Sequence, residues 1–413
     1  MTSGPVAPAD RVQELDVLRG VALYGVFVMN MVWLGNQGIM ATEQQLLSMP
    51  TAGIDFAVRA LVGWLVGDKA NTLFAFLFGL GFYLQMRRAE LAGRDFERLY
   101  LRRLSALLAF GLFHLVFIFF WDILSIYALA GFALFALRRT TDRVLLWGGL
   151  GLALGARILF QWLAEHTGLG DWAGRADPYT AAAVLARQQL SDAGDYGGLV
   201  RAMGAVTLHE LLNGILLGWM LYALGRFMLG AWTGRKGWLQ RSGDYLPGFR
   251  RVMAVTLPAG LVSQGLVAIV RVYEPGGRLP DWDHWSLAAE TVHLLTAPIL
   301  ATGYLCAIVV GLHTPGWRRL LAPFRHAGRM ALSNYVMQSF ICGFVLFGVG
   351  PGLALAGRIG ATALLIVATA AFAAQVVVSH WWLARFRYGP LEWAWRGLTY
   401  GEWPPAAAGS RAP

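Results

Sequence analysis

Charged residues are scarce in this sequence: Asp, Glu, Lys and Arg make up 14% of its 413 residues, against about 25% in soluble domains. Cysteine is scarcer still, because only Cys306 and Cys342 occur and both lie inside apolar runs. Two such thiols argue against a disulfide framework and predict no metal site. The HExxH, GxSxG and P-loop patterns are also missing, which argues against a zinc protease, an α/β-hydrolase and a P-loop nucleotidase.

Long apolar runs are abundant, since 57% of the residues are hydrophobic. Runs of about 20 apolar residues are typical of membrane-spanning helices. We therefore expect an all-α polytopic integral membrane protein with an N-terminal cytoplasmic segment at 1–16, a transmembrane domain at 17–383 and a cytoplasmic tail at 384–413. The ten predicted helices are 17–35, 70–86, 103–120, 123–138, 144–163, 207–229, 252–272, 290–312, 330–348 and 359–383. The apolar piece 54–66 is too short to span and predicts an interfacial or re-entrant segment.

Basic residues favour one set of predicted loops, and this bias predicts an orientation. With the N-terminus in the cytoplasm, most arginines fall on the inner side, among them those between 87 and 103, Arg226 and Arg235. The positive-inside rule then places both termini in the cytoplasm and the 164–206 loop outside. It also explains the net charge of +10, so nucleic acid is not expected as a partner because no stacking platform accompanies the charge. The expected location is the cell (plasma or inner) membrane.

One predicted hairpin, 101–131, carries the histidine on which the functional hypothesis depends. His114 lies eleven residues past Arg103, roughly 16 Å along a helix, which is about half the hydrocarbon core. An ionisable group at that depth is a candidate functional residue. Asp122 lies roughly 12 Å further along the same axis. The two side chains can therefore meet only if the helix ends early or another group bridges them.

Further polar residues lie inside the predicted helices or at their ends. Asn30 follows Arg19 by eleven residues, the spacing that also separates Arg103 from His114. Singly, each of these polar residues is more typical of an interhelical hydrogen bond than of a functional site. Together they predict a polar cavity open to the outside, because such groups have no solvation in lipid. The residues expected to line it are Lys69, Arg157, His209, Asn213, Glu290, His293, Asn334 and Gln338.

Five segments also carry a family resemblance. They are LDVLRGVALYGVFVMNMVWLG, KANTLFAFLFGLGFYL, the 101–131 hairpin, GRMALSNYVMQSFICGFVLFG and WWLARFRYGPLEWAWRGLTYGEW. In series, over about residues 11–403, they resemble the YeiB-like family, domain of unknown function 418. This resemblance implies a relation to transmembrane acyltransferases such as heparan-alpha-glucosaminide N-acetyltransferase and the acyltransferase-3 proteins.

Such a relation implies an acyl-CoA donor in the cytoplasm and an acceptor at or across the membrane. In acyltransferase-3 proteins a histidine essential for activity follows a helix-1 arginine by eleven residues, and here Asn30 stands in its place. The lysosomal relative uses a histidine in the loop after that helix, and the corresponding loop here has none. His114 is therefore the leading candidate for the catalytic base.

The first hypothesis is a membrane-embedded acyltransferase that moves an acyl (acetyl) group from cytoplasmic acyl-CoA to a hydroxyl or amine acceptor held in the outer cavity, at the outer face. His114 is the proposed general base, because an imidazole with an ordinary pKa of roughly 6.5 accepts protons at neutral pH. Asp122, Asn30 and Lys69 are expected to position the acceptor or the developing oxyanion. Guanidinium groups suit the phosphates of CoA, and the candidates are Arg19, Arg102, Arg103, Arg385, Arg387 and Arg396.

Two other classes of function stay open. One is a transporter or exporter of a small metabolite, with or without proton coupling, in which His114, Arg157 and Asp122 bind solute or relay protons. The other is a non-catalytic membrane partner or sensor. We expect no permanently bound cofactor, since acyl-CoA is a substrate, and the expected partners are the lipid bilayer and a small-molecule acceptor. Whether the chain forms a homo-oligomer is also left open.

Overall fold

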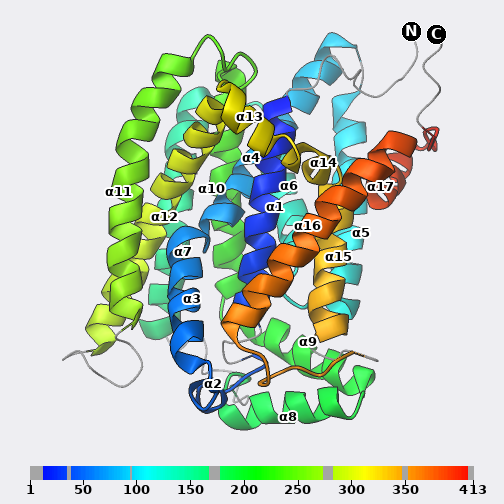
Figure 1. Cartoon of the computed structure of the whole chain (residues 1–413). Coiled ribbons are helices and arrows are strands. Elements are labelled where there is room, and N and C mark those ends of the chain that lie inside the picture. Colours follow the sequence, from blue (N-terminus) through cyan, green and yellow to red (C-terminus); the bar gives the residue numbers. More distant parts are fainter. Residues whose placement is uncertain are drawn as a thin grey trace.

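A computed structural model describes residues 13–34, 39–93, 95–166, 177–272, 282–346 and 352–407, which form a bundle of helices (Figure 1). In this part of the chain, seven helical segments are long and apolar enough to cross a membrane. Three shorter apolar helices, Ile123–Ala136, Val144–Phe160 and Ala331–Leu346, lie within the remaining predicted spans. The chain is therefore an all-helical polytopic membrane protein, and ten full crossings stay a prediction.

Most of the bundle consists of long helices, joined by short ones. The long ones are α1 (Gln13–Leu34), α4 (Lys69–Leu91), α5 (Phe96–Phe117), α7 (Gly149–His166), α10 (Ile215–Lys236), α11 (Leu246–Val272), α12 (Trp282–Leu312) and α16 (Ala361–Arg385). The shorter α6 (Ile123–Ala136) packs between α5 and α10. The others are α2 (Glu43–Leu47), α3 (Ala52–Leu65), α8 (Ala181–Asp192), α9 (Tyr196–Leu212), α13 (Pro315–Leu321), α14 (Phe324–Arg329), α15 (Ala331–Phe340) and α17 (Pro390–Tyr400), with π-helical turns at η2 (Val144–Gly148) and η3 (Ile341–Leu346).

The piece at 54–66 belongs to α3, which together with α4 forms one interrupted helical segment, Ala52–Leu91, and whether it is interfacial or re-entrant stays a prediction. α3 is 14 residues long, roughly 21 Å, and packs against α11 and α16. The break ends at Asp68, whose φ of 58° lies in the left-handed region that non-glycine residues rarely adopt. α4 begins at the next residue, Lys69. An interrupted backbone inside a membrane protein is tolerated only where protein or water surrounds it.

α1 runs through the middle of the bundle and is the most buried of the candidate spans (Figure 1). α14 lies directly on it, because glycines allow the two backbones to touch. A Cβ on Gly328 would lie 1.9 Å from the carbonyl oxygen of Asp16, and one on Gly20 would lie 2.1 Å from that of Phe324. The LDVLRG and GRMALSNY segments, about 310 residues apart, are therefore packed together without intervening side chains.

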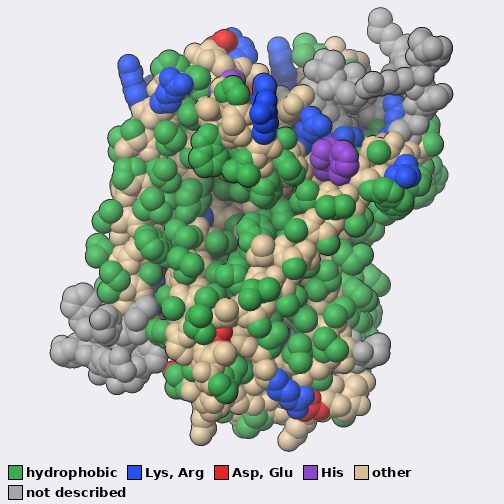
Figure 2. Space-filling model, in the orientation of Figure 1, with side chains coloured by type: hydrophobic (Ala, Val, Ile, Leu, Met, Phe, Trp, Pro, Cys, Tyr) green, Lys and Arg blue, Asp and Glu red, His purple; other side chains and the backbone are tan. Residues whose placement is uncertain are grey.

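Lysine and arginine side chains gather at one end of the molecule on the face shown in Figure 2. This is the end at which α13, α14 and α17 lie in Figure 1, whereas α2 and α8 lie at the opposite end. The bias agrees in direction with the predicted cytoplasmic side, and it determines where a negatively charged ligand is attracted to the protein.

Candidate functional site

A pocket of about 670 Å³ lies at the basic end, between α1, α4, α5, α6, α14, α15 and α17. We call it the arginine pocket, because six arginines line it against two carboxylates, Asp16 and Glu392, which leaves an excess of four positive charges. The volume falls within the range of about 300–1,000 Å³ that is usual for small-molecule sites. The six arginines are Arg19, Arg88, Arg103, Arg329, Arg387 and Arg396.

The remaining lining of the arginine pocket is largely apolar and aromatic. Its residues include Phe74, Phe78, Leu107, Ile123, Leu124, Tyr127 and Tyr335. Tyr127 and Tyr335 are both buried. A ligand that combines several negative charges with an apolar or neutral end therefore matches the lining, since guanidinium groups bind phosphate and the aromatic part excludes water.

α17 closes one side of the pocket and is held there by its aromatic and acidic side chains. The indole N–H of Trp395 donates to the backbone carbonyl of Arg103 at 2.9 Å, and the Arg103 guanidinium lies 3.6 Å from the centre of the Trp395 ring. Arg396 lies 4.6 Å from the centre of the Tyr388 ring. These contacts hold two guanidinium groups in place beside the pocket.

Glu392 of α17 caps the start of α15. Its carboxylate accepts hydrogen bonds from the backbone N–H groups of Leu332, at 2.7 Å, and Ser333, at 3.1 Å, and from the Ser333 hydroxyl at 2.6 Å. A carboxylate at a helix N-terminus satisfies free N–H groups and interacts favourably with the positive end of the helix dipole. Burial raises the pKa of Glu392, although the hydrogen bonds from Ser333 and Leu332 act in the opposite direction. The GRMALSNY and FRYGPLEWAWR segments therefore meet at this carboxylate.

His114 and Asp122 are brought together because α5 ends early. The predicted helix 103–120 stops at Phe117, and the N–H groups of Ile118 and Phe119 both donate to the carbonyl of His114. The chain then folds back, so that Asp122 Oδ1 lies 2.9 Å from His114 Nδ1. The alignment of these two atoms does not meet hydrogen-bond geometry, but the distance allows the carboxylate to stabilise a protonated imidazole.

Asp122 is itself fixed as the N-cap of α6. Its two carboxylate oxygens accept from the backbone N–H groups of Leu124, at 3.0 Å, and Ser125, at 2.5 Å. α5 and α6 approach closely at this point, since a Cβ on Gly111 would lie 2.4 Å from Ser125 N. His114 and Asp122 can therefore meet because the helix ends early, which is one of the two conditions expected from the sequence.

The His114–Asp122 pair is buried and lies behind the wall of the arginine pocket. His114 is only 1% exposed, and Tyr335, whose ring centre lies 5.2 Å from that of His114, lines the pocket. His114 Nε2 has no hydrogen-bond partner in the described part of the chain. The residue that separates the pair from the arginine pocket is Tyr335, and this pocket lies at the basic end. A route to the pair from the outside stays a prediction.

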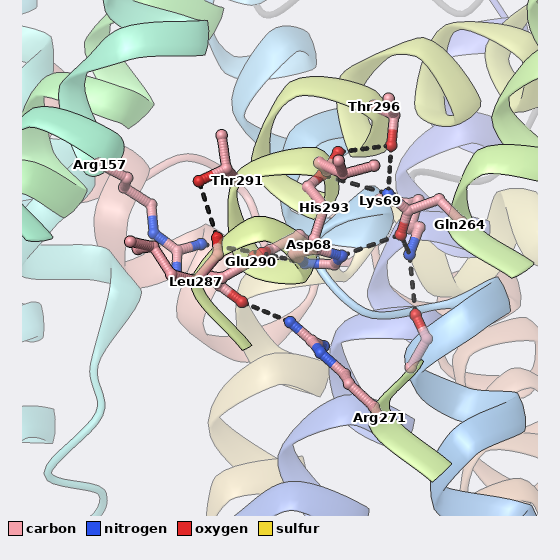
Figure 3. Close-up of polar contacts among 12 residues, drawn as sticks. Asp68, Lys69, Arg157, Gln264, Arg271, Leu287, Glu290, Thr291, His293 and Thr296 are labelled. Carbon is pink, nitrogen blue, oxygen red and sulfur yellow. Dashed lines mark hydrogen bonds and ion pairs between the residues drawn. The ribbon is translucent and has the colours of Figure 1, made fainter. Parts of the chain in front are cut away.

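A second polar cluster surrounds the break between α3 and α4 (Figure 3). Asp68 Oδ2 contacts Arg157 Nη1 at 2.8 Å and His293 Nε2 at 2.9 Å. Glu290 pairs with Arg157 at 3.4 Å and with Arg271. These contacts bring together three of the predicted cavity residues, Arg157, Glu290 and His293, which come from α7 and α12.

Lys69 lies in the same cluster but binds neutral groups. Its ammonium donates to Gln264 Oε1 at 2.5 Å and to the Gly63 carbonyl at 2.8 Å. Gln264 also contacts His293 Nδ1 at 2.9 Å and donates to Thr296 at 2.7 Å. Gln264, from α11, therefore links α4 to α12 inside the bundle.

The other predicted residues lie elsewhere. Asn30 is half-buried on α1 and is not among the described residues that line the arginine pocket. Two of the six predicted CoA-binding arginines are not among them either. Arg102 donates to the Leu398 carbonyl, and Arg385 donates to the Trp381 carbonyl. His209 of α9 bonds Asn213, the residue that caps the end of this helix, at 2.9 Å. Asn334 donates to Ser379 and Gln338 to Gln375, so both join α15 to α16.

Sequence reasoning missed several residues of these sites. Arg88 and Arg329 line the arginine pocket, as does Tyr335. The sequence does not distinguish an arginine that lines a pocket from one that only follows the positive-inside rule. Glu392 offered a signal, since it is the single acidic residue among the arginines from 385 to 396. In the described ranges, no group of three or more His, Cys, Asp or Glu side chains is placed to hold a metal ion.

Comparison with known proteins supports the family resemblance. Residues 233–402 match the family model described as "Protein of unknown function (DUF418)". The chain is 30% identical over 419 residues to the uncharacterized protein YxaH of Bacillus subtilis (strain 168), with 98% of each chain covered. It is 28% identical over 408 residues to the uncharacterized protein YeiB of Escherichia coli (strain K12), covering 96% of this chain and 98% of that one. The chain therefore belongs to the YeiB-like DUF418 family.

Proposed function

We propose that the protein is a membrane-embedded acyltransferase whose donor is acyl-CoA. The observation that carries this proposal is the arginine pocket, with six arginines, a largely apolar and aromatic remainder and a buried His–Asp pair behind one wall. The phosphates of CoA pair with the guanidinium groups, of which Arg19, Arg103, Arg387 and Arg396 were expected from the sequence. The acyl thioester then lies towards Tyr127 and Tyr335. The proposed N-in, C-in topology in the inner membrane exposes this pocket to cytoplasmic acyl-CoA.

His114 is the proposed general base of the transfer. The hydroxyl or amine of the acceptor attacks the thioester carbonyl, its proton passes to His114 Nε2, and the C–S bond breaks. The CoA thiolate leaves and takes up that proton, so the imidazole is regenerated. Asp122 stabilises the imidazolium in between, as a carboxylate beside a histidine does. Because Tyr335 separates the pair from the pocket, its ring must move aside when the acceptor binds.

Binding of CoA to the purified protein tests this proposal. Calorimetry with CoA and acetyl-CoA should give saturable binding to the wild type. Arg396→Gln should weaken it by about 10-fold or more, since a charge-assisted hydrogen bond to phosphate is lost. Arg385→Gln is the matched control, because this arginine is exposed, lies outside the pocket and should bind CoA as the wild type does. No binding by the wild type, or equal weakening in both variants, would refute the proposal.

A transporter is the second candidate, and the interrupted α3–α4 helix favours it. Broken helices with buried charges at the break are typical of solute sites in transporters, and the cluster of Asp68, Arg157 and His293 lies at such a break. Uptake of solute into proteoliposomes without acyl-CoA would favour transport. Strict dependence of any solute modification on acyl-CoA would favour transfer.

A further inference from the structure

The charges at the α3–α4 break do not balance. Asp68 and Glu290 pair with Arg157 and Arg271. Lys69 and Arg226 remain without a carboxylate contact within the described residues, even with His293 counted as neutral. Lys69 has two neutral oxygens as acceptors. Asp68 acts on both cations from a longer distance, but it already contacts Arg157 and His293. Two buried cations without an ion-pair contact of their own are costly in a low-dielectric interior, so the site has fewer negative than positive charges.

Of these two cations, Arg226 has the fewer hydrogen-bond acceptors. The sequence pattern placed it at the inner edge, but it lies ten residues before the end of α10 and is 2% exposed. Its Nε and Nη2 have no hydrogen-bond partner in the described part of the chain. The guanidinium lies 3.1 Å from the centre of the Tyr222 ring, which attracts the cation but accepts no ordinary hydrogen bond. Donors fixed in this way are available to a ligand.

Further unpartnered polar atoms lie at the start of α4 and on α10. Asn71 Oδ1, Thr72 Oγ1 and the Tyr222 hydroxyl are buried, and none has a hydrogen-bond partner among the described residues. Buried polar atoms are nearly always satisfied by protein, water or ligand. Asn71 Oδ1 accepts only, whereas Arg226 donates only. A ligand that satisfies both therefore carries an anionic group and also a hydroxyl or amine.

This group of atoms adjoins the arginine pocket through one residue. Tyr127 lines that pocket, and its hydroxyl donates to the backbone carbonyl of Asn71 at 3.3 Å. Its ring also packs edge-on against Phe227, the residue after Arg226, with 5.1 Å between ring centres. Tyr127 therefore contacts both the arginine pocket and the segments that carry Asn71 and Arg226.

We propose that Arg226, Asn71 and Thr72 form the binding site for the acyl acceptor, and that this acceptor is a small molecule with a carboxylate or phosphate group beside its reactive hydroxyl or amine. The inference rests on the proposed acyltransferase function. The guanidinium fork of Arg226 binds the anionic group. Asn71 accepts a hydrogen bond from the hydroxyl or amine, and the reactive end points towards Tyr127 and the acyl group.

Thermal unfolding of the full-length protein in detergent tests the site. The probes are inorganic phosphate, glycolate, which has a carboxylate and a hydroxyl, and ethylene glycol, its neutral counterpart, at constant ionic strength. We expect phosphate or glycolate, but not ethylene glycol, to raise the melting temperature of the wild type in a saturable manner. Repeating the titration in nanodiscs with and without phosphatidylglycerol distinguishes a soluble anion from a lipid headgroup. If no anion or anionic lipid stabilises the wild type, the inference is wrong.

Two variants and a control locate the effect. Arg226→Met should weaken the anion response by about 10-fold or more, and without ligand it should melt at or above the wild type, because a buried charge without an ion-pair contact is removed. Arg235→Met, on the same helix but bonded to Thr140, Arg138 and Asp142, should keep the anion response. A lower melting temperature of unliganded Arg226→Met, or an unchanged response, overturns the inference. If Arg226→Met does not fold, Arg226→Lys, which keeps the charge but loses the fork, should show the weakened response.

Binding of CoA, measured on the same samples, separates the two proposals. The Arg226→Met variant should bind CoA as the wild type does, because Arg226 is not among the described residues lining the arginine pocket. CoA binding without an anion response overturns the acceptor site alone. An anion response without CoA binding overturns the acyltransferase and, with it, the assignment of the anion as acceptor.

Discussion

Removing the Glu392 carboxylate measures how strongly α17 is tied to the bundle beside the arginine pocket. The carboxylate accepts three hydrogen bonds at the start of α15, two from backbone N–H groups and one from the Ser333 hydroxyl. Hydrogen bonds to a charged group contribute about 1.5–3 kcal/mol each. The cost of burying the carboxylate offsets part of their sum. We therefore expect Glu392→Ala to lower the free energy of unfolding by about 2–4 kcal/mol.

The assay is thermal unfolding at pH 7 combined with CoA calorimetry. A loss of this size should lower the melting temperature by roughly 4–8 °C, and CoA should bind more weakly because Arg396 and Trp395 lie on the released helix. Glu402→Ala is the control, since Glu402 is exposed and its substitution removes the same charge near the same end of the chain. A Glu392→Ala protein that melts within about 1 °C of the wild type and binds CoA equally well would refute the reasoning.

The pH dependence gives an independent check on Glu392. Because burial raises its pKa in the folded protein, the folded state holds the proton more tightly than the unfolded state does. The resulting stability is fully present below the unfolded pKa and is lost as the pH rises through the folded pKa. The stability of the wild type relative to Glu392→Gln, which has no titrating group, should therefore fall as the pH rises above the ordinary glutamate pKa of about 4.3. An advantage that grows with pH contradicts this assignment.

Three further changes test other parts of the structure. Gly328→Ala places a Cβ 1.9 Å from the Asp16 carbonyl and should cost about 1–3 kcal/mol in thermal unfolding, whereas Gly316→Ala, with open space around it, should not. Asp122→Asn keeps an oxygen at the start of α6 but removes the charge beside His114. Acyl transfer should fall about 10²–10⁴-fold with unchanged CoA affinity, and an unchanged rate refutes the assigned role of Asp122 beside His114. Hydrogen bonds from Lys236 and Arg235 lower the pKa of Asp142, so its contribution is present above the unfolded pKa and lost as the pH falls through the folded one. Because Asp142 is 41% exposed, Asp142→Asn should cost less than about 1 kcal/mol at pH 7, and the difference in melting temperature should shrink as the pH falls below the ordinary aspartate pKa of about 3.9.

The helices were predictable because lipid leaves the backbone no other hydrogen-bond partners. Apolar runs therefore indicate helices even where their ends are wrong. The end of α5 could not be predicted, since residues 118–120 are as apolar as those before them. Tertiary packing decides it: Gly111 lets the start of α6 fold back against α5, and Asp122 then caps α6. The His114–Asp122 pair depends on that turn. The sequence could therefore predict only the condition for the pair, an early end of the helix, and not the pair itself.

The arginines show a different limit of sequence reasoning. Arg102 and Arg103 are neighbours with the same composition around them, yet Arg103 packs on Trp395 and lines the pocket while Arg102 bonds α17 from an exposed position. Which neighbour faces inward depends on where α17 docks, and this in turn depends on Glu392. Arg226 was hidden for a related reason, because the positive-inside rule assigns an arginine to an edge before its partners are known.

The start of α6 explains why the three polar features lie so close together. Asp122 caps this helix and contacts His114, Ile123 and Leu124 line the arginine pocket, and Tyr127, one turn further, also lines it and bonds Asn71. The start of α6, from Asp122 to Tyr127, therefore contacts the proposed base, the proposed donor pocket and the proposed acceptor site. If a ligand shifts this turn, the base, the donor pocket and the acceptor site change together. CoA and the anion then alter each other's affinity by the same factor, because binding linkage is reciprocal. Equal affinity for the anion with and without CoA would mean that the turn stays rigid and that Tyr335 alone opens the path to His114.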